Sequence, residues 1–302
     1  MNTPASESVP LSPNPTTITK PTNLPADESP IKPLVTIQAH KFWSLVDLHE
    51  LWVYRELLYL LSLRDIQVRY KQTLLGVTWV VLQPLLTTLV FTLFLGFLLR
   101  VPSEGYPYIL FVYTGMLPWT FFSAAISTSG NSLVSNAHLI TKVYFPRSIL
   151  PISAVAARLV DLLIGFLLLV SLMVYFGVRP TANLLLLPLL ILLMTLLALA
   201  VGMLTSALNV KYRDVGVLIP VLVQLWMYAS PVVYPAGLVP ARWRQLYELN
   251  PMAGLIGNFR TAVLGGPINW KSLAVATIII IGLLMVVSIQ FRRMEHQFAD
   301  VV

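Results

Sequence analysis

Six long apolar stretches follow one another through most of the chain, and they restrict its fold more than any other feature. Each is close to the ~20 residues that an α-helix needs to cross ~30 Å of hydrocarbon. Several contain proline, which membrane helices tolerate better than soluble helices do. The pattern predicts an all-α membrane protein with about six transmembrane helices, at residues 76–99, 109–127, 149–176, 184–208, 215–233 and 273–291.

The composition agrees with a lipid environment. Of the 302 residues, 57% are hydrophobic and only 11% are charged, and the mean hydropathy is +0.77. Soluble domains carry about 25% charged residues, so one oversized soluble core is excluded. The net charge of +7 does not indicate nucleic-acid binding, because the basic residues lie in short segments between apolar runs. Membrane proteins set their orientation in this way.

The distribution of basic residues predicts that both termini are cytoplasmic. On that topology, fourteen of the 20 Lys and Arg residues lie inside and six outside, as the positive-inside rule requires. The six outer residues are Arg100, Arg179, Arg242, Arg244, Arg260 and Lys271.

The first 40 residues contain eight prolines among Ser, Thr and Asn. Proline removes backbone donors, and the segment has few apolar residues to offset the entropy cost of ordering, so we expect a disordered cytoplasmic tail at 1–40. The segment has no apolar core typical of a cleavable signal peptide, and we expect none.

A proline-free segment at 51–75 predicts a helix with two different faces in its second half. Leu63, Ile66, Tyr70 and Leu74 lie on one face, and charged and polar residues lie on the other. This pattern favours an amphipathic helix in the cytoplasmic headgroup plane. The alternative is an ordinary amphipathic helix packed on a soluble domain. We therefore divide the chain into an interface region at 41–75 and a transmembrane domain at 76–302.

The external segment 234–272 predicts two short helices, at 240–249 and 251–264. Asn250 suits the N-cap of the second helix, and Pro251 suits its first position. Each helix is too short to span a bilayer, so each lies on the outer surface or re-enters where protein shields its ends. Both possibilities remain open.

The sequence gives no reason to expect enzymatic chemistry. It contains no phosphate-binding G-x-x-x-x-G-K-[ST] loop, no nucleophile elbow and no H-E-x-x-H pair. It has no Cys, and its four His residues lack ligand spacing, so we expect no catalytic residue, bound cofactor or metal site. Arg158 and Asp161, three residues apart in the third span, form either a structural ion pair or a gate contact to another helix.

Eight short motifs in a fixed order point to one family. They are LRDIQVRYKQ at 63–72, LGVTW at 75–79, QP at 83–84, GMLPWTFF at 115–122, KVYFPR at 142–147, LNVKYRD at 208–214, SPVVYP at 230–235 and LNPM at 249–252. In this order and spacing the chain, from about residue 50 onward, resembles type-2 ABC exporter permeases of the O-antigen (Wzm) and teichoic-acid (TagG) kind.

The resemblance implies a homodimer in the bacterial inner membrane, paired with two copies of a separate ABC ATPase that uses ATP and magnesium. It also implies a channel at the dimer axis for undecaprenyl-diphosphate-linked polysaccharide moving to the periplasm. Rival hypotheses are a permease for teichoic acid, capsular glycan or a small hydrophobic drug, a membrane glycosyltransferase, and a channel or secondary transporter.

The cytoplasmic loop at 129–147 is the candidate contact to the ATPase. It mixes apolar and basic side chains, as a short amphipathic helix docked in a partner's groove would. The alternative is a plain connection between spans. The coupling candidates are Leu139, Lys142, Tyr144, Phe145 and Arg147.

Two further groups are candidates for substrate contact. Arg64, Arg69 and Lys71 lie at the expected headgroup depth, where they either bind the lipid diphosphate or anchor the helix on anionic lipid. Aromatic rings can stack on sugars, and we expect such a path on the dimer axis; helix packing or an interfacial belt is the alternative. The path candidates are Trp119, Phe122, Trp226 and Tyr228.

Overall fold

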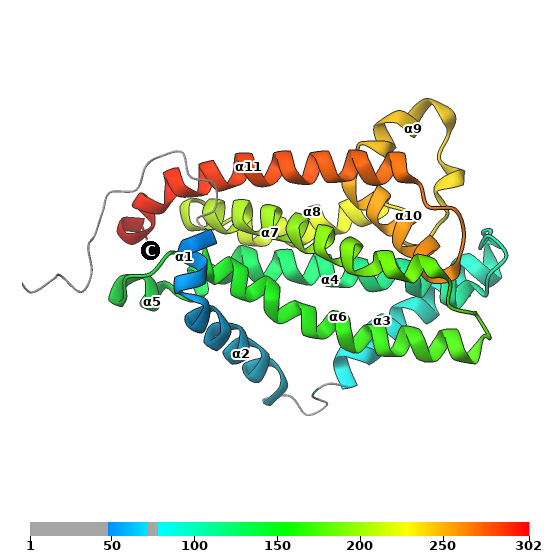
Figure 1. The fold of residues 1–302 in the computed structure, drawn as a ribbon, viewed down its shortest axis with the longest axis horizontal. Coiled ribbons are helices and arrows are strands. Elements are labelled where there is room, and N and C mark those ends of the chain that lie inside the picture. Colours follow the sequence, from blue (N-terminus) through cyan, green and yellow to red (C-terminus); the bar gives the residue numbers. More distant parts are fainter. Residues whose placement is uncertain (1–47, 72–75, 77, 302) are drawn as a thin grey trace, which may run out of the picture. The chain divides into compact units, whose positions relative to one another are not determined.

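The computed structural model describes the backbone of residues 48–71, 76 and 78–301, and the side chains of those between 51 and 295 (Figure 1). The predicted tail at 1–40 lies outside these residues, as does Leu74 of the predicted amphipathic face. Throughout the described part of the chain, the regular secondary structure is helical.

The helices follow one another in an order close to that predicted. They are α1 (Leu48–Val53), α2 (Arg55–Lys71), α3 (Thr78–Phe91) with a π-helical continuation (Thr92–Leu98), α4 (Tyr108–Ser135), α5 (Ala137–Lys142), α6 (Ile149–Tyr175), α7 (Leu187–Lys211) after a 3-10 turn (Ala182–Leu186), α8 (Val215–Tyr228), α9 (Ala241–Glu248) after a second 3-10 turn (Ala236–Leu238), α10 (Pro251–Leu264) and α11 (Trp270–Val301).

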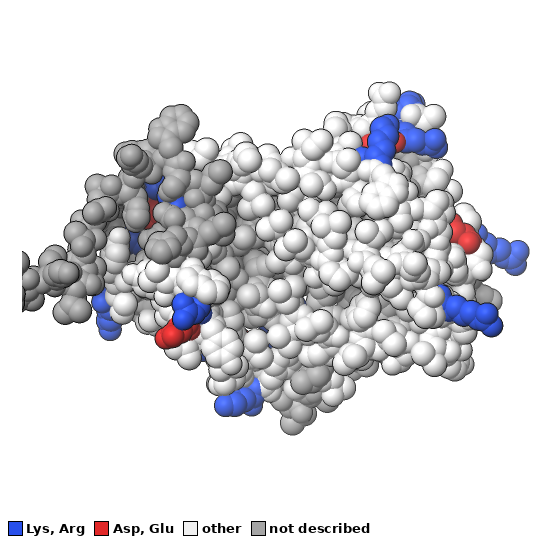
Figure 2. All heavy atoms as spheres, in the orientation of Figure 1, with Lys and Arg blue, Asp and Glu red and all other residues white. Residues whose placement is uncertain are grey.

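Five helices of the described chain are long and apolar enough to cross a membrane: α3 with its continuation, α4, α6, α7 and α11. Figure 2 shows charged side chains gathered toward the two ends of one face, with a broad band between them that carries almost none. The prediction of an all-α membrane protein with about six spans is confirmed, the sixth being the shorter helix α8.

Helix α8 is shorter than the sequence predicted. We expected a span at 215–233, but α8 has 14 residues and ends at Tyr228. A helix of that length covers about 21 Å, which is less than the ~30 Å of hydrocarbon. The five residues after Tyr228 form turns, and Ser230, Val232 and Val233 are buried there. The segment that follows α8 is therefore packed into the protein, whereas Tyr228 at the end of the helix is exposed.

Helix α4 lies at the centre of the fold and packs against α6, α7, α8 and α10. Its side chains are mostly buried, and the Tyr113 hydroxyl donates to the carbonyl of Gly165 on α6 at 2.9 Å. Where α7 crosses α4, a Cβ at Gly202 would lie 2.4 Å from Oγ of Ser129. Small residues at such a crossing allow close approach of two membrane helices.

Helix α2 packs obliquely along α6 (Figure 1). Its Ser62 hydroxyl lies 3.4 Å from the carbonyl of Ser153 and donates to the carbonyl of Leu58 at 2.8 Å. Eight residues further along each helix, Tyr70 of α2 contacts Asp161 of α6. The two helices therefore advance in the same direction. The placement of α2 in the headgroup plane stays a prediction.

The two short helices before the last span differ in their environment. Helix α9 has no buried residue, whereas twelve of the 14 residues of α10 are buried. Helix α10 packs against α11, α4 and α7. Of the two possibilities for these helices, shielding by protein therefore applies to α10.

Candidate functional site

Four side chains from α2 and α6 form an ionic cluster on one carboxylate. Asp161 accepts hydrogen bonds from the guanidinium of Arg69 and the hydroxyl of Tyr70, both on α2. It also accepts from Nη1 of Arg158, one turn earlier on α6, at 3.1 Å. Nε of Arg158 lies 3.3 Å from Oγ1 of Thr128 on α4. The cluster thus connects three helices.

The predicted contact between Arg158 and Asp161 is present, and it also reaches another helix, because Arg69 and Tyr70 come from α2. Two guanidinium groups share one carboxylate, so these three groups carry one excess positive charge. The side chains of Arg69, Arg158 and Asp161 are between 15% and 24% exposed, so the cluster is accessible at its edge. Burial, followed by the hydrogen bond to Asp161, raises the pKa of Tyr70, so its phenol stays a neutral donor.

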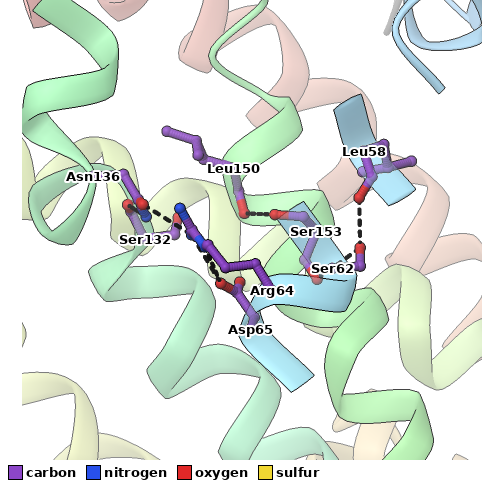
Figure 3. A network of polar contacts seen from close by, with 8 residues as sticks. All are labelled: Leu58, Ser62, Arg64, Asp65, Ser132, Asn136, Leu150 and Ser153. Carbon is purple, nitrogen blue, oxygen red and sulfur yellow. Dashed lines mark hydrogen bonds and ion pairs between the residues drawn. The ribbon is translucent and has the colours of Figure 1, made fainter. Parts of the chain in front are cut away.

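A second polar network lies nearer the start of α2 (Figure 3). Arg64 donates to Oδ1 of Asp65 from Nη2 at 2.8 Å, and to Oδ1 of Asn136 at 2.9 Å. Asn136 follows α4 and donates back to the carbonyl of Ser132 at 2.8 Å. Arg64 therefore joins α2 to the corner between α4 and α5.

The three bases predicted to meet a lipid headgroup are therefore not one cluster. Arg64 contacts the α4–α5 corner and Arg69 contacts Asp161. Lys71 is exposed, with Nζ 3.4 Å from Oε1 of Gln67 on the same helix. Binding of a diphosphate by these bases stays a prediction.

The loop predicted at 129–147 begins later than expected, because α4 continues to Ser135; the predicted ATPase contact therefore consists of α5 and the segment that follows it. Tyr144 is 78% exposed, whereas Phe145 is 6% exposed and packs into an apolar cluster with Ile149 and Phe291. Leu139 packs at the edge of the same cluster, and Lys142 is exposed. The two adjacent aromatic residues therefore differ: only Tyr144 can meet a partner in this conformation.

Arg147 ties the end of this loop to the last helix. Its backbone N–H donates to Oε1 of Glu295 on α11 at 2.9 Å, and its guanidinium donates to the carbonyl of Glu295. The sequence did not single out Glu295, because nothing local pairs it with a residue 148 positions earlier. Arg147 thus supports the loop from within the chain.

The residues of the predicted aromatic path also differ in their exposure. Trp119, Phe122 and Trp226 form one ring cluster, with centroids 5.6 Å apart between the first two and 5.2 Å between the last two. Trp119 and Phe122 are buried inside the chain, so in this conformation they face neither an axis nor lipid. Tyr228 is 56% exposed. The packing alternative describes Trp119 and Phe122 here, and their role in transport stays a prediction.

Asn250 holds the C-terminal end of α8. As predicted, it caps α10, its Oδ1 accepting from the backbone N–H of Met252 at 3.1 Å. The same oxygen accepts from Nε1 of Trp226 at 2.9 Å, and Nδ2 donates to the carbonyl of Ala229 at 3.0 Å and to Oγ of Ser230 at 2.9 Å. These bonds satisfy backbone groups that the end of a helix leaves unpaired.

Arg260 of α10 also holds the segment after α8 that Asn250 contacts. The sequence placed Arg260 among the outer charges, but its relative exposure is only 4%. Its Nη2 donates to the carbonyls of Pro231 and Val232, each at 2.9 Å. The sequence did not indicate this role, for which the only local signal is an arginine inside an apolar helix.

Among the described residues, no group of three or more His, Asp or Glu side chains is arranged to hold a metal ion. The chemistry that these residues offer is electrostatic: a partly exposed cationic cluster near the middle of α6, and Asn250 and the buried guanidinium of Arg260 at the end of α8. Such an arrangement can bind an anion and hold helix ends in place.

Comparison with known proteins places the chain among membrane transport proteins. Residues 56–264 match the model of the ABC-2 type transporter family. The O-antigen export system permease protein RfbA of Myxococcus xanthus is 32% identical over 213 residues, which cover 70% of this chain and 81% of the relative. A protein of the same name from Klebsiella pneumoniae is 26% identical over 248 residues, covering 82% and 95%. The polysialic acid transport protein KpsM of Escherichia coli is 25% identical over 219 residues, covering 69% and 81%.

Proposed function

This chain belongs to the ABC-2 type transporter family, and we propose that it is the permease subunit of an ATP-driven exporter of lipid-linked O-antigen-type polysaccharide. The observation that carries the proposal is its similarity to an O-antigen export permease over 95% of that relative's length. The cargo moves from the cytoplasmic to the periplasmic side of the bacterial inner membrane. Both termini are cytoplasmic.

The energy comes from a separate chain in this proposal. Two copies of a separate ABC ATPase bind ATP and magnesium, as the resemblance to this family implies. The given sequence itself has no phosphate-binding loop of the Walker type. Exposed Tyr144 and Lys142 meet the ATPase. Phe145 and Arg147 anchor the loop to the rest of the chain, so that a push on α5 reaches α6 and α11.

The permease acts as a homodimer. Helix α8 leaves one continuous apolar face uncovered within the described chain, and a second copy of the same face would complete it. The face has helical spacing and consists of Val217, Leu218, Val221, Leu222 and Leu225, with Tyr228 at its outer end. In this proposal the polysaccharide passes along the axis between the two copies, past Tyr228.

Deletion of the gene in the bacterium that encodes the chain tests the cargo and the direction. We expect surface polysaccharide to disappear and lipid-linked polysaccharide to accumulate inside, with recovery on complementation. Affinity purification of the tagged chain should recover a Walker-type ATPase. Unchanged surface polysaccharide would reject the export function, and purification without an ATPase would favour a channel or an enzyme.

Capsular polysaccharide is the second candidate cargo, because the chain is also similar to a polysialic acid transport protein. The same deletion separates the two cargoes. Loss of a capsule with intact O-antigen would assign the capsular role, and loss of O-antigen alone would assign the first.

A further inference from the structure

The cluster around Asp161 consists of donors that converge on one acceptor group. Two guanidinium groups and one phenol hydroxyl donate to its carboxylate: Arg69 and Arg158 to Oδ2, and Tyr70 to Oδ1. Two guanidinium groups carry twice the charge of the single carboxylate that they share, so one positive charge is left uncompensated within the cluster. The donor set therefore suits an acceptor with more negative charge.

Phosphate has the chemistry that this donor set favours. Arginine binds phosphate oxygens through charge-assisted hydrogen bonds, and its planar fork is well matched to them. The contact between Nε of Arg158 and Thr128 orients this guanidinium from a third helix, independently of Asp161. At least one donor would thus stay in place if the carboxylate moved away.

We propose that Asp161 is an internal substitute for a phosphate group, and that a diphosphate-bearing lipid displaces it from Arg69, Arg158 and Tyr70. The inference rests on the proposed function only in naming the lipid as the carrier of the exported glycan. Beyond the predicted headgroup bases, it assigns Arg158 and Tyr70 to the binding site and gives Asp161 the role of a competing ligand.

The competition explains how such a site would select its ligand. A carboxylate on the same chain acts at high effective concentration, so a weak anion does not displace it. A diphosphate carries more charge than the single phosphodiester of phosphatidylglycerol and offers more acceptor oxygens. Once Asp161 is displaced, the phosphate takes its place between Arg69 and Tyr70 of α2 and Arg158 of α6, so the ligand joins the two helices in place of the carboxylate.

The test measures binding to the purified full-length chain in neutral phosphatidylcholine nanodiscs, with farnesyl diphosphate as the probe. Asp161→Asn removes the competing charge, and we expect it to bind the probe about tenfold more tightly, which corresponds to about 1.4 kcal/mol. Arg158→Gln and Arg69→Gln remove donors and should each weaken binding about tenfold. A purely structural ion pair predicts that all three variants lose thermal stability, with no tightening in Asp161→Asn.

Glu248→Gln is the matched control. It removes one negative charge from another ion pair, that with Lys271 at 3.0 Å, and should leave probe affinity unchanged. Tyr70→Phe keeps every charge and should weaken binding a few-fold, which provides a test if Asp161→Asn does not fold. Unaltered or weaker binding in Asp161→Asn, or full affinity in both Tyr70→Phe and Arg158→Gln, would overturn the proposal.

A second arm replaces the probe with phosphatidylglycerol in the nanodisc. Equal tightening by Asp161→Asn for both lipids would overturn the diphosphate assignment and leave a site for any anionic headgroup. The measurement needs neither an ATPase nor a polysaccharide. Failure of the gene deletion to affect export would therefore reject the proposed function and leave the binding result unchanged. A negative binding result would likewise overturn this inference and leave the proposed export function unchanged.

Discussion

Arg260 lies across the face of Phe111, with its guanidinium carbon 3.8 Å from the centroid of the ring. The stack brings a buried cation of α10 against α4, where the ring face attracts it. The same guanidinium donates to the carbonyls of Pro231 and Val232 beyond α8. Three segments far apart in sequence therefore meet at one side chain, and their packing depends on the shape of the guanidinium as well as on its charge.

The first prediction concerns Gly115, because the contacts around Arg260 leave no room there for a side chain. A Cβ at Gly115 would lie 2.1 Å from the carbonyl oxygen of Val232 and 2.7 Å from Nη2 of Arg260. Gly115→Ala should therefore destabilise the permease by about 1–3 kcal/mol, the usual cost of overpacking. Thermal unfolding of the purified chain measures the change. Gly257→Ala is the control, because a Cβ there has no neighbour within 4 Å; equal stability of the two variants would contradict the packing described here.

The second prediction concerns the charge and shape of Arg260. Lysine in its place keeps the charge but loses the planar group that stacks on Phe111 and donates to two carbonyls. We expect Arg260→Lys to lose about 1–3 kcal/mol of stability, because buried carbonyls lose their donor. Proteolysis within the 229–249 segment should become faster in the variant. Protection equal to that of the unmodified protein would show that Arg260 does not hold this segment.

Much of the fold follows from the sequence because lipid imposes a simple rule. Each span must present a continuous apolar run of sufficient length, and five of the six predicted spans are helices long enough to cross. The exception is α8, because the sequence predicts that residues 229–233 continue this helix. The chain instead turns there, with Pro231 in the turn, and Asn250 and Arg260 donate to the carbonyls. Those partners lie about 20–30 residues later, beyond any local pattern.

The candidate sites were less predictable for the same reason. The pair of Arg158 and Asp161 could be recognised from its spacing of three on one helix. The contact between Arg69 and Asp161 joins residues 92 positions apart, and no periodic pattern in the sequence predicts it. Tyr144 and Phe145 are neighbours in a segment without regular structure, so only the fold decides which one is buried.

The third prediction separates these two neighbours at the proposed ATPase contact. Tyr144→Ala should leave the stability of the permease unchanged, since the ring is exposed, and should weaken recovery of the ATPase, because such anchors commonly contribute more than about 1 kcal/mol. Phe145→Ala should lower stability by about 3–5 kcal/mol, as loss of a buried Phe does. Co-purification and thermal unfolding of both variants check the two effects. Normal ATPase recovery and export with Tyr144→Ala would make the loop a plain connection.

The last prediction concerns the aromatic path, for which Tyr228 gives the cleanest test. Stacking on sugars needs a ring face and tolerates many hydroxyl patterns, so weak contacts of about 0.5–1.5 kcal/mol each would let a polymer slide. Tyr228 is 56% exposed, so Tyr228→Leu should keep the fold and slow export, whereas Tyr228→Phe should retain it. Trp119 is buried, so Trp119→Leu should reduce stability as well as export. Export rates, each divided by the amount of folded permease, separate these effects. Equal corrected rates for the Leu and Phe variants of Tyr228 would assign this ring to helix packing or to the interfacial belt.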